Sequence, residues 1–143
     1  MWEIKVVLIL LIITTLLWGV TPIIEKIGLL RVDPLIGITL RSFIVTGGLI
    51  ILLVFIGKHK QLIEVDGKSF LIFSTSGLLA GLLGMWTYYT VLKAWPTSKV
   101  VPIAASYPLV TVILSTIILR EGINFSRLIG PLLIILGIWL VKR

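Results

Sequence analysis

The sequence predicts an all-α integral membrane protein that forms a bundle of five transmembrane helices. It is 58% hydrophobic and 13% charged, with a mean hydropathy of +1.17, whereas soluble domains are roughly 45–50% apolar and about 25% charged. Its charged residues stand between long apolar runs. In lipid the backbone must satisfy its hydrogen bonds within each segment, so these runs are expected to form continuous helices. The five spans are expected at about residues 6–27, 34–57, 69–93, 98–119 and 124–141.

The first two spans have clear boundaries. No charged residue interrupts the first run until Glu25 and Lys26, so it meets the roughly 17–25 residues that a spanning helix needs. This run is too long for a secretory signal peptide, and we expect it to be retained. Asp33 then supplies an N-cap acceptor, and Pro34 fits the first helical position, where its missing N–H is not needed. The second span is expected to end near Gly57.

A polar loop, residues 58–68, precedes the third span, and Trp95-Pro96 ends that span because proline disfavours helix in the residue before it. The fourth span is uncharged from Val100 to Leu119. The cation Arg120 and the nearby Gly122 that follow are typical of a helix C-terminus. The fifth has a shorter charge-free stretch, Leu128–Val141. It reaches full length if Arg127 extends to the interface.

Composition also excludes several classes of function. The chain has no cysteine, which excludes disulfides and thiolate metal sites. Its net charge of +7 comes from residues dispersed between apolar runs, so we interpret them as topology and headgroup anchors and expect no nucleic acid partner. The sequence has no metal-binding cluster, phosphate loop or serine–histidine pairing. We therefore expect no catalysis, cofactor or metal.

Small residues indicate which helix faces pack closely. Gly77, Gly81 and Gly84 share one face of the third span, and the first two form a GxxxG spacing that permits close backbone approach. Gly130 and Gly137 form a sparser stripe in the fifth span. We expect these five glycines to contribute to helix packing.

Candidate residues for a substrate cavity lie beside the prolines and aromatics of the spans. A proline inside a helix removes the hydrogen bond to the carbonyl four residues earlier, and such interruptions tend to occur at the binding sites of transporters. Aromatic and hydroxyl side chains nearby are able to line a cavity, although the aromatics also suit an interfacial belt. The candidates are Trp18, Pro22, Arg41, Trp86, Tyr88, Tyr89, Ser106, Tyr107 and Pro108.

Arg41 is the cation farthest from the ends of a predicted span, roughly 10 Å from the start of its helix at 1.5 Å per residue. It either snorkels to the nearer surface or faces the bundle, where it would attract an anionic substrate or pair with Glu25. All six acidic residues are expected at span ends or in loops.

Several motifs, in order along the chain, resemble the EamA domain of the drug/metabolite transporter superfamily. They are Leu17–Ile24, Asp33-Pro34 with Leu40-Arg41-Ser42, Tyr88–Lys93, Ser98–Ile103, Ser106–Val110 and Arg120–Ile123. The resemblance implies a transporter built from five-helix units, of which relatives usually fuse two in inverted orientation. We expect a facilitator or exporter of a small polar metabolite in the cell membrane. This chain resembles one unit, so a partner unit is expected. The alternative is a non-transporting membrane subunit or an accessory of a lipid-linked-sugar flippase.

The distribution of lysine and arginine indicates what the partner is. Five spans would place six cations on each side of the membrane: Lys5, Lys58, Lys60, Lys68, Arg120 and Arg127 against Lys26, Arg31, Lys93, Lys99, Lys142 and Arg143. Orientation follows the asymmetry of these residues in short loops, and here the asymmetry is zero. The sequence therefore favours insertion in both orientations and an antiparallel homodimer, with pairing to another half-size transporter as the alternative.

Overall fold

The long apolar runs of the sequence form helices in the structure. The computed structural model describes residues 4–120, 122 and 125–142, and no strand occurs within these ranges. Within the part of the chain that the structure describes, four helical segments are long and apolar enough to cross a membrane. An all-helical fold with several candidate membrane spans is therefore confirmed, whereas the count of five spans stays a prediction. The four segments are Ile4–Leu29, Pro34–Phe55, Gly67–Ala94 and Thr97–Ile118.

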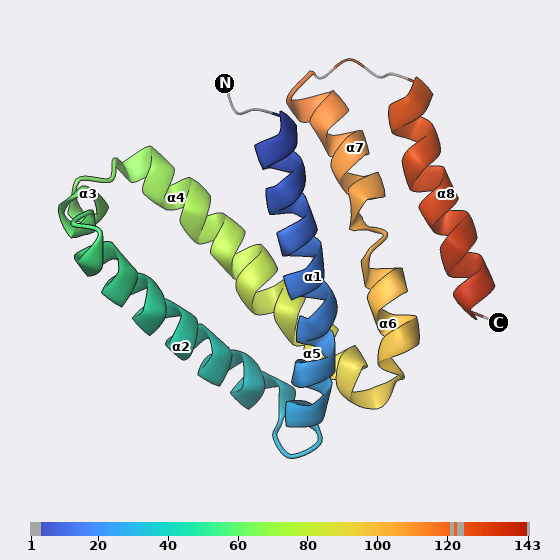
Figure 1. The fold of residues 1–143 in the computed structure, drawn as a ribbon, viewed down its shortest axis with the longest axis horizontal. Helices are drawn as coiled ribbons and strands as arrows, with labels where there is room; N and C mark the ends of the chain where they lie inside the picture. The colour runs from blue at the N-terminus through green and yellow to red at the C-terminus, as the bar shows by residue number, and fades with distance from the viewer. Residues whose placement is uncertain (1–3, 121, 123–124, 143) are drawn as a thin grey trace. The chain divides into compact units, whose positions relative to one another are not determined.

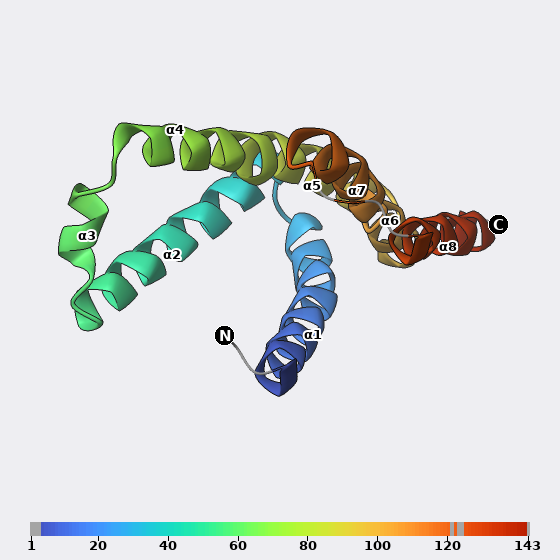
Figure 2. The same ribbon diagram turned by 90° about the horizontal axis from the view of Figure 1, so that it is seen from above.

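The chain divides into two compact units, Met1–Ala94 and Trp95–Arg143. In the first unit, α5 packs against both α1 and α2, and these two helices diverge as they extend away from it (Figures 1 and 2). The short α3 joins the far end of α2 to α4. The elements of this unit are α1 (Ile4–Leu29), α2 (Pro34–Phe55), α3 (His59–Ile63), α4 (Gly67–Ser76), a π-helical segment η1 (Gly77–Gly84) and α5 (Met85–Ala94).

Local capping sets both ends of α2. The predicted N-cap is confirmed, because the Asp33 carboxylate accepts a hydrogen bond of 2.8 Å from the N–H of Leu35. At the other end Gly57 has a φ of 77°, a left-handed conformation that glycine adopts without steric strain. The N–H of Lys58 then donates to the carbonyl of Leu53 at 2.9 Å. This bond spans five residues, as in a Schellman motif, and satisfies a carbonyl of the last helical turn.

The expected loop between the second and third spans contains one turn of helix, α3, which sequence analysis did not predict. After it, the carboxylate of Asp66 accepts hydrogen bonds from the N–H groups of Lys68 and Ser69, at 3.1 and 3.0 Å, and caps α4. Hydrogen bonds from Ser69 lower the pKa of Asp66 from its usual value, since they stabilise the charged carboxylate.

The glycine stripe of the third span coincides with the π-helical segment η1. A Cβ added to Gly84 would lie 3.1 Å from the carbonyl oxygen of Leu79, five residues earlier, so glycine suits this widened turn. Within the first unit, no atom lies within 4 Å of a Cβ built on Gly77 or Gly81. The packing role of this stripe therefore stays a prediction, and its partner would lie outside this unit.

The second unit contains α6 (Thr97–Ala104), α7 (Tyr107–Ile118) and α8 (Phe125–Lys142). The predicted fourth span is interrupted at Ala105 and Ser106, between α6 and α7, and Pro108 lies in the first turn of α7. The helix α8 packs against both α6 and α7 (Figure 1). After the end of α7, Arg120 has a φ of 53°. An arginine therefore takes the left-handed conformation at this helix end, where sequence analysis expected Gly122.

Most of the surface of both units is apolar. Side chains such as Phe43 and Phe55 are 78% and 89% exposed, and an apolar surface of this extent is suited to contact with lipid. The buried side chains of the first unit include Leu29, Ile38 and Leu92. They lie where α1, α2 and α5 meet, so this junction is the packed part of the unit.

One glycine that sequence analysis did not single out permits that junction to form. A Cβ on Gly37 of α2 would lie 3.4 Å from the Tyr89 ring and 3.5 Å from the Leu29 side chain. An alanine would therefore make ordinary contacts, whereas a longer side chain would push α2 away from α5.

We predict that Gly37→Leu lowers the free energy of unfolding by about 1–3 kcal/mol, the usual effect of an overpacked site. Thermal unfolding of the purified protein in detergent measures this effect. Gly47→Leu is the matched control, since it lies on the same helix and no atom lies within 4 Å of its added Cβ. Equal destabilisation by the two substitutions would contradict the close packing at Gly37.

Candidate functional site

Three helices of the first unit converge near one end of each. The last turns of α1 and α5 meet the first turns of α2, and the buried residues Leu29, Pro34 and Leu92 fill the contact. Apolar side chains are about equally favourable against another helix and against lipid, so apolar burial alone does little to hold membrane helices together. Polar contacts within this junction are therefore the interactions expected to select its geometry.

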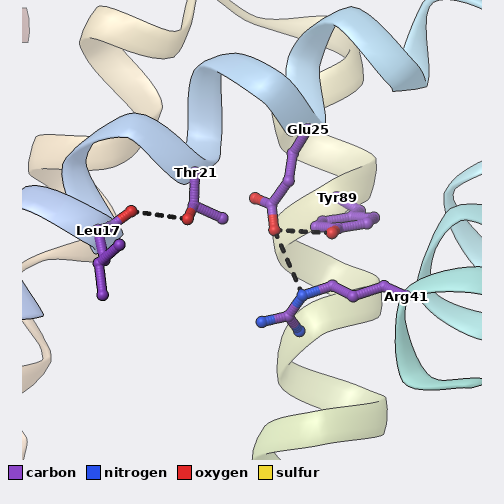
Figure 3. A network of polar contacts seen from close by, with 5 residues as sticks. All are labelled: Leu17, Thr21, Glu25, Arg41 and Tyr89. Carbon is purple, nitrogen blue, oxygen red and sulfur yellow. Dashed lines mark hydrogen bonds and ion pairs between the residues drawn. The ribbon is translucent and has the colours of Figure 1, made fainter. Parts of the chain in front are cut away.

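A carboxylate joins the three helices. Glu25 lies one turn before the end of α1, and its side chain is only 9% exposed. The Tyr89 hydroxyl of α5 donates a hydrogen bond of 2.7 Å to Glu25 Oε1. Arg41 Nε of α2 lies 3.7 Å from the same oxygen, as Figure 3 shows. One oxygen atom therefore contacts groups from both neighbouring helices.

The two contacts of this oxygen differ in kind. A distance of 2.7 Å is typical of a hydrogen bond from a hydroxyl to a carboxylate. A distance of 3.7 Å exceeds the hydrogen-bond range, so Arg41 and Glu25 form an ion pair without a hydrogen bond. The Arg41 side chain is 46% exposed. We refer to Glu25, Arg41 and Tyr89 as the polar triad.

Two lysines fix the ends of the same helices. Lys26 Nζ donates hydrogen bonds to the backbone carbonyls of Leu92 and Lys93, at 2.6 and 2.9 Å. These carbonyls belong to the last turn of α5, where helices lack internal donors and where a cation is favourable. Lys93 Nζ in turn donates to the carbonyl of Val32 at 2.8 Å, in the loop between α1 and α2.

The predicted cavity residues of the first unit have different environments. Tyr89 and Arg41 belong to the polar triad, and Pro22 is buried inside α1, which continues past it to Leu29. The ring of Tyr88 is half-buried, with its centroid 6.2 Å from that of Tyr89. Trp18 and Trp86, by contrast, are exposed on their helices.

The remaining candidates, Ser106, Tyr107 and Pro108, lie in the second unit at the break between α6 and α7. The Ser106 hydroxyl donates to the carbonyl of Ile103 at 2.8 Å, and the Tyr107 ring is exposed. An interrupted helix with a hydroxyl and an aromatic side chain fits the prediction of a cavity wall. That these residues share one cavity with the first unit stays a prediction.

Sequence analysis placed Glu25 at a span end and did not include it among the cavity candidates. The structure continues α1 for one turn beyond it, so Glu25 lies inside the helix. Of the two alternatives for Arg41, the structure shows the pair with Glu25. The signal in the sequence was the presence of opposite charges in two adjacent spans. Among the described residues, no three His, Asp or Glu side chains gather as a metal site.

Comparison with known proteins identifies the fold family. The profile of the EamA-like transporter family matches residues 5–143. The chain belongs to the EamA-like transporter family. An uncharacterized protein of Methanocaldococcus jannaschii is 34% identical over 95 residues, 66% of this chain and 69% of that protein. An uncharacterized transporter of Archaeoglobus fulgidus is 27% identical over 79 residues, 55% of this chain and 28% of that protein. No solved structure matches.

The lengths of these EamA-like relatives differ. Because the match covers similar shares of both chains, the Methanocaldococcus protein is about as long as this chain. The Archaeoglobus transporter is about twice as long, and this chain spans well under half of it. The chain is therefore similar to one protein of about its own length and to one of about twice its length.

We predict that Tyr89→Phe destabilises the EamA-like chain by about 1.5–3 kcal/mol, the usual value of a hydrogen bond to a charged group. The change leaves the buried ring in place and removes only the donor to Glu25. Chemical or thermal unfolding in detergent measures it. Tyr88→Phe is the matched control, since no hydrogen bond of the Tyr88 hydroxyl is found among the described residues. Equal effects at the two tyrosines would show that the hydroxyl contact does not stabilise the unit.

Proposed function

We propose that this chain transports a small polar metabolite across the cell membrane and that the polar triad lines part of the solute path. The observation that carries the proposal is an ion pair inside apolar, span-length helices of a chain from a transporter family. Ionisable residues within membrane spans are unfavourable in lipid and commonly mark pathways for solutes or ions. The Arg41 side chain stays 46% exposed while it pairs with Glu25, so it is accessible for a further contact.

We further propose that the working assembly is an antiparallel dimer of five-helix units. Transporters built from inverted repeats place their substrate sites at the interface between the repeats. The family match covers residues 5–143 of this chain, which is the length of one proposed five-helix unit. A relative of about twice the length has room for two such units. A second copy inserted in the opposite orientation would supply the missing repeat. The equal numbers of cations on the two sides support this arrangement.

The glycine face of η1 supports the same proposal. Gly77 and Gly81 present no side chain, and no atom of the first unit lies within 4 Å of their added Cβ atoms. Small residues at this spacing permit two membrane helices to approach closely. The exposed apolar side chains around them, including Leu78 and Leu82, would then extend the contact with the partner helix.

The dimer proposal predicts that the chain inserts in both orientations. A C-terminal reporter active only in the cytoplasm and another active only outside should both signal. Two or three lysines added after Met1 should retain that end in the cytoplasm and, with five spans, silence the cytoplasmic C-terminal reporter. Transport should then fall, and coexpression with an oppositely biased variant should restore it. Signals from one side only, with transport intact, would exclude the antiparallel homodimer.

The proposed path also predicts which aromatic residues matter for transport. Trp18→Ala, Trp86→Ala and Tyr107→Ala should each reduce transport about tenfold, equivalent to about 1.4 kcal/mol of lost contact, at unchanged protein level. Counterflow of labelled small metabolites in proteoliposomes measures this. Trp139→Ala on α8 is the control, since it lies near the end of its helix. If Trp139→Ala impairs transport the most, the assignment of the path is wrong.

A further inference from the structure

Resting on the proposed function, we infer that Arg41 binds a carboxylate group of the transported solute through its two terminal nitrogens. In this arrangement Tyr89 holds the Glu25 carboxylate beside Nε of Arg41, where it offsets part of the charge, and the outer edge of the guanidinium group stays available. The substrate class is therefore small carboxylates, including zwitterionic amino acids. The inference rests on the geometry of the polar triad, on its exposure and on the charge around it.

The first support is the unused hydrogen-bonding capacity of Arg41. A guanidinium group has five N–H donors in a planar fork, and its recorded contact is the ion pair of Nε with Glu25. Figure 3 shows the two terminal nitrogens on the side of the guanidinium group that faces away from Glu25. Among the described residues, neither terminal nitrogen has a recorded partner. A planar anion with two oxygens matches this edge in bidentate geometry.

The second support is that Glu25 is held away from this edge. Its Oε1 accepts the short hydrogen bond of 2.7 Å from Tyr89, and Tyr89 is fixed because its ring is buried against Gly37 and Leu29. The carboxylate therefore stays at 3.7 Å from Arg41 Nε, outside hydrogen-bond distance. Glu25 offsets the charge of Arg41 without satisfying its donors.

The third support is the local charge. Four cations and two anions lie near the junction of the three helices: Lys26, Arg31, Arg41 and Lys93 against Glu25 and Asp33. This excess of positive charge favours an anionic group over a cationic one. The Lys26 and Lys93 ammonium groups already donate to backbone carbonyls. Arg41, 46% exposed, thus combines accessible charge with available donors.

A phospholipid headgroup offers similar oxyanion chemistry, but the position of Arg41 favours a solute. The residue lies about 10 Å along α2 from Pro34, at 1.5 Å per residue. Its side chain extends from α2 toward Glu25 on α1 (Figure 3). At this depth a solute within the path would reach the outer edge with the ion pair intact, and the lipid comparison below tests the headgroup alternative.

The test compares carboxylates with amides of the same size on the purified full chain. Thermal unfolding is measured with propionate against propionamide, lactate against lactamide, and alanine against alaninamide, since a ligand that binds the folded state raises the apparent stability. We expect carboxylates to stabilise the protein and their amides not to. Arg41→Lys keeps the charge but loses the planar fork of donors. It should raise the apparent Kd for the carboxylates about tenfold or more, as expected for one lost charged hydrogen bond.

Two further variants separate binding from folding. Arg31→Lys, at an exposed loop arginine, should leave the carboxylate effect unchanged. Glu25→Gln retains an oxygen for Tyr89 and removes the negative charge beside Arg41, so carboxylates should bind as tightly or more tightly. If Arg41→Lys fails to fold, the comparison of carboxylates with amides in the wild type and in Glu25→Gln still tests the carboxylate site. Loss of carboxylate preference in Glu25→Gln would overturn the inference.

The remaining outcomes distinguish this inference from the proposed function. Equal stabilisation by amides, or by neither class, would overturn the carboxylate site, and transport of the amides in proteoliposomes would leave the transporter proposal intact. Carboxylate binding without transport of any solute in the panel would overturn the proposed function and leave the site. The last outcome concerns lipid. If Arg41→Lys changes the apparent thermal stability only in nanodiscs containing phosphatidylglycerol, and not in phosphatidylcholine, Arg41 binds lipid headgroups and the inference is overturned.

Discussion

The geometry of the first unit depends on the compensation of one carboxylate in an apolar environment. Glu25 is 9% exposed, and a charged group removed from water requires hydrogen-bonding or ionic partners close by. Tyr89 and Arg41 supply these partners from two other helices, so the charge is compensated only when all three helices approach. Close approach of α2 and α5 in turn requires the small residue Gly37. Packing and polarity at this junction therefore depend on each other.

Much of the fold was predictable because it depends on local sequence. Apolar runs and the Asp33 cap act within a few residues, so the helical fold, its candidate membrane spans and the start of α2 follow from local sequence. The π-helical segment η1 was missed. Glycines at this spacing are equally typical of helix packing, and the sequence does not distinguish a widened turn from a packing face.

The polar triad was harder to predict because its contacts join residues far apart in the chain. Glu25 and Tyr89 are 64 positions apart, and helical periodicity does not determine which helices are neighbours. Arg41 had two alternatives in the sequence, a snorkelling side chain and a pair with Glu25, and only the approach of α1 to α2 decides between them. Gly37 was overlooked for the same reason: its role comes from the ring of Tyr89 on another helix.

The depth of the polar triad has a geometric consequence for an antiparallel dimer. At 1.5 Å per residue its members lie about 6–10 Å from the ends of their helices, all at the same end of the unit. A two-fold axis in the membrane plane would therefore place the triad of one copy near one surface and that of its mate near the other. A solute would then meet an equivalent arginine from either side. Because the contacts of the triad lie within the first unit of a single chain, each copy of such a dimer would carry a complete triad of its own.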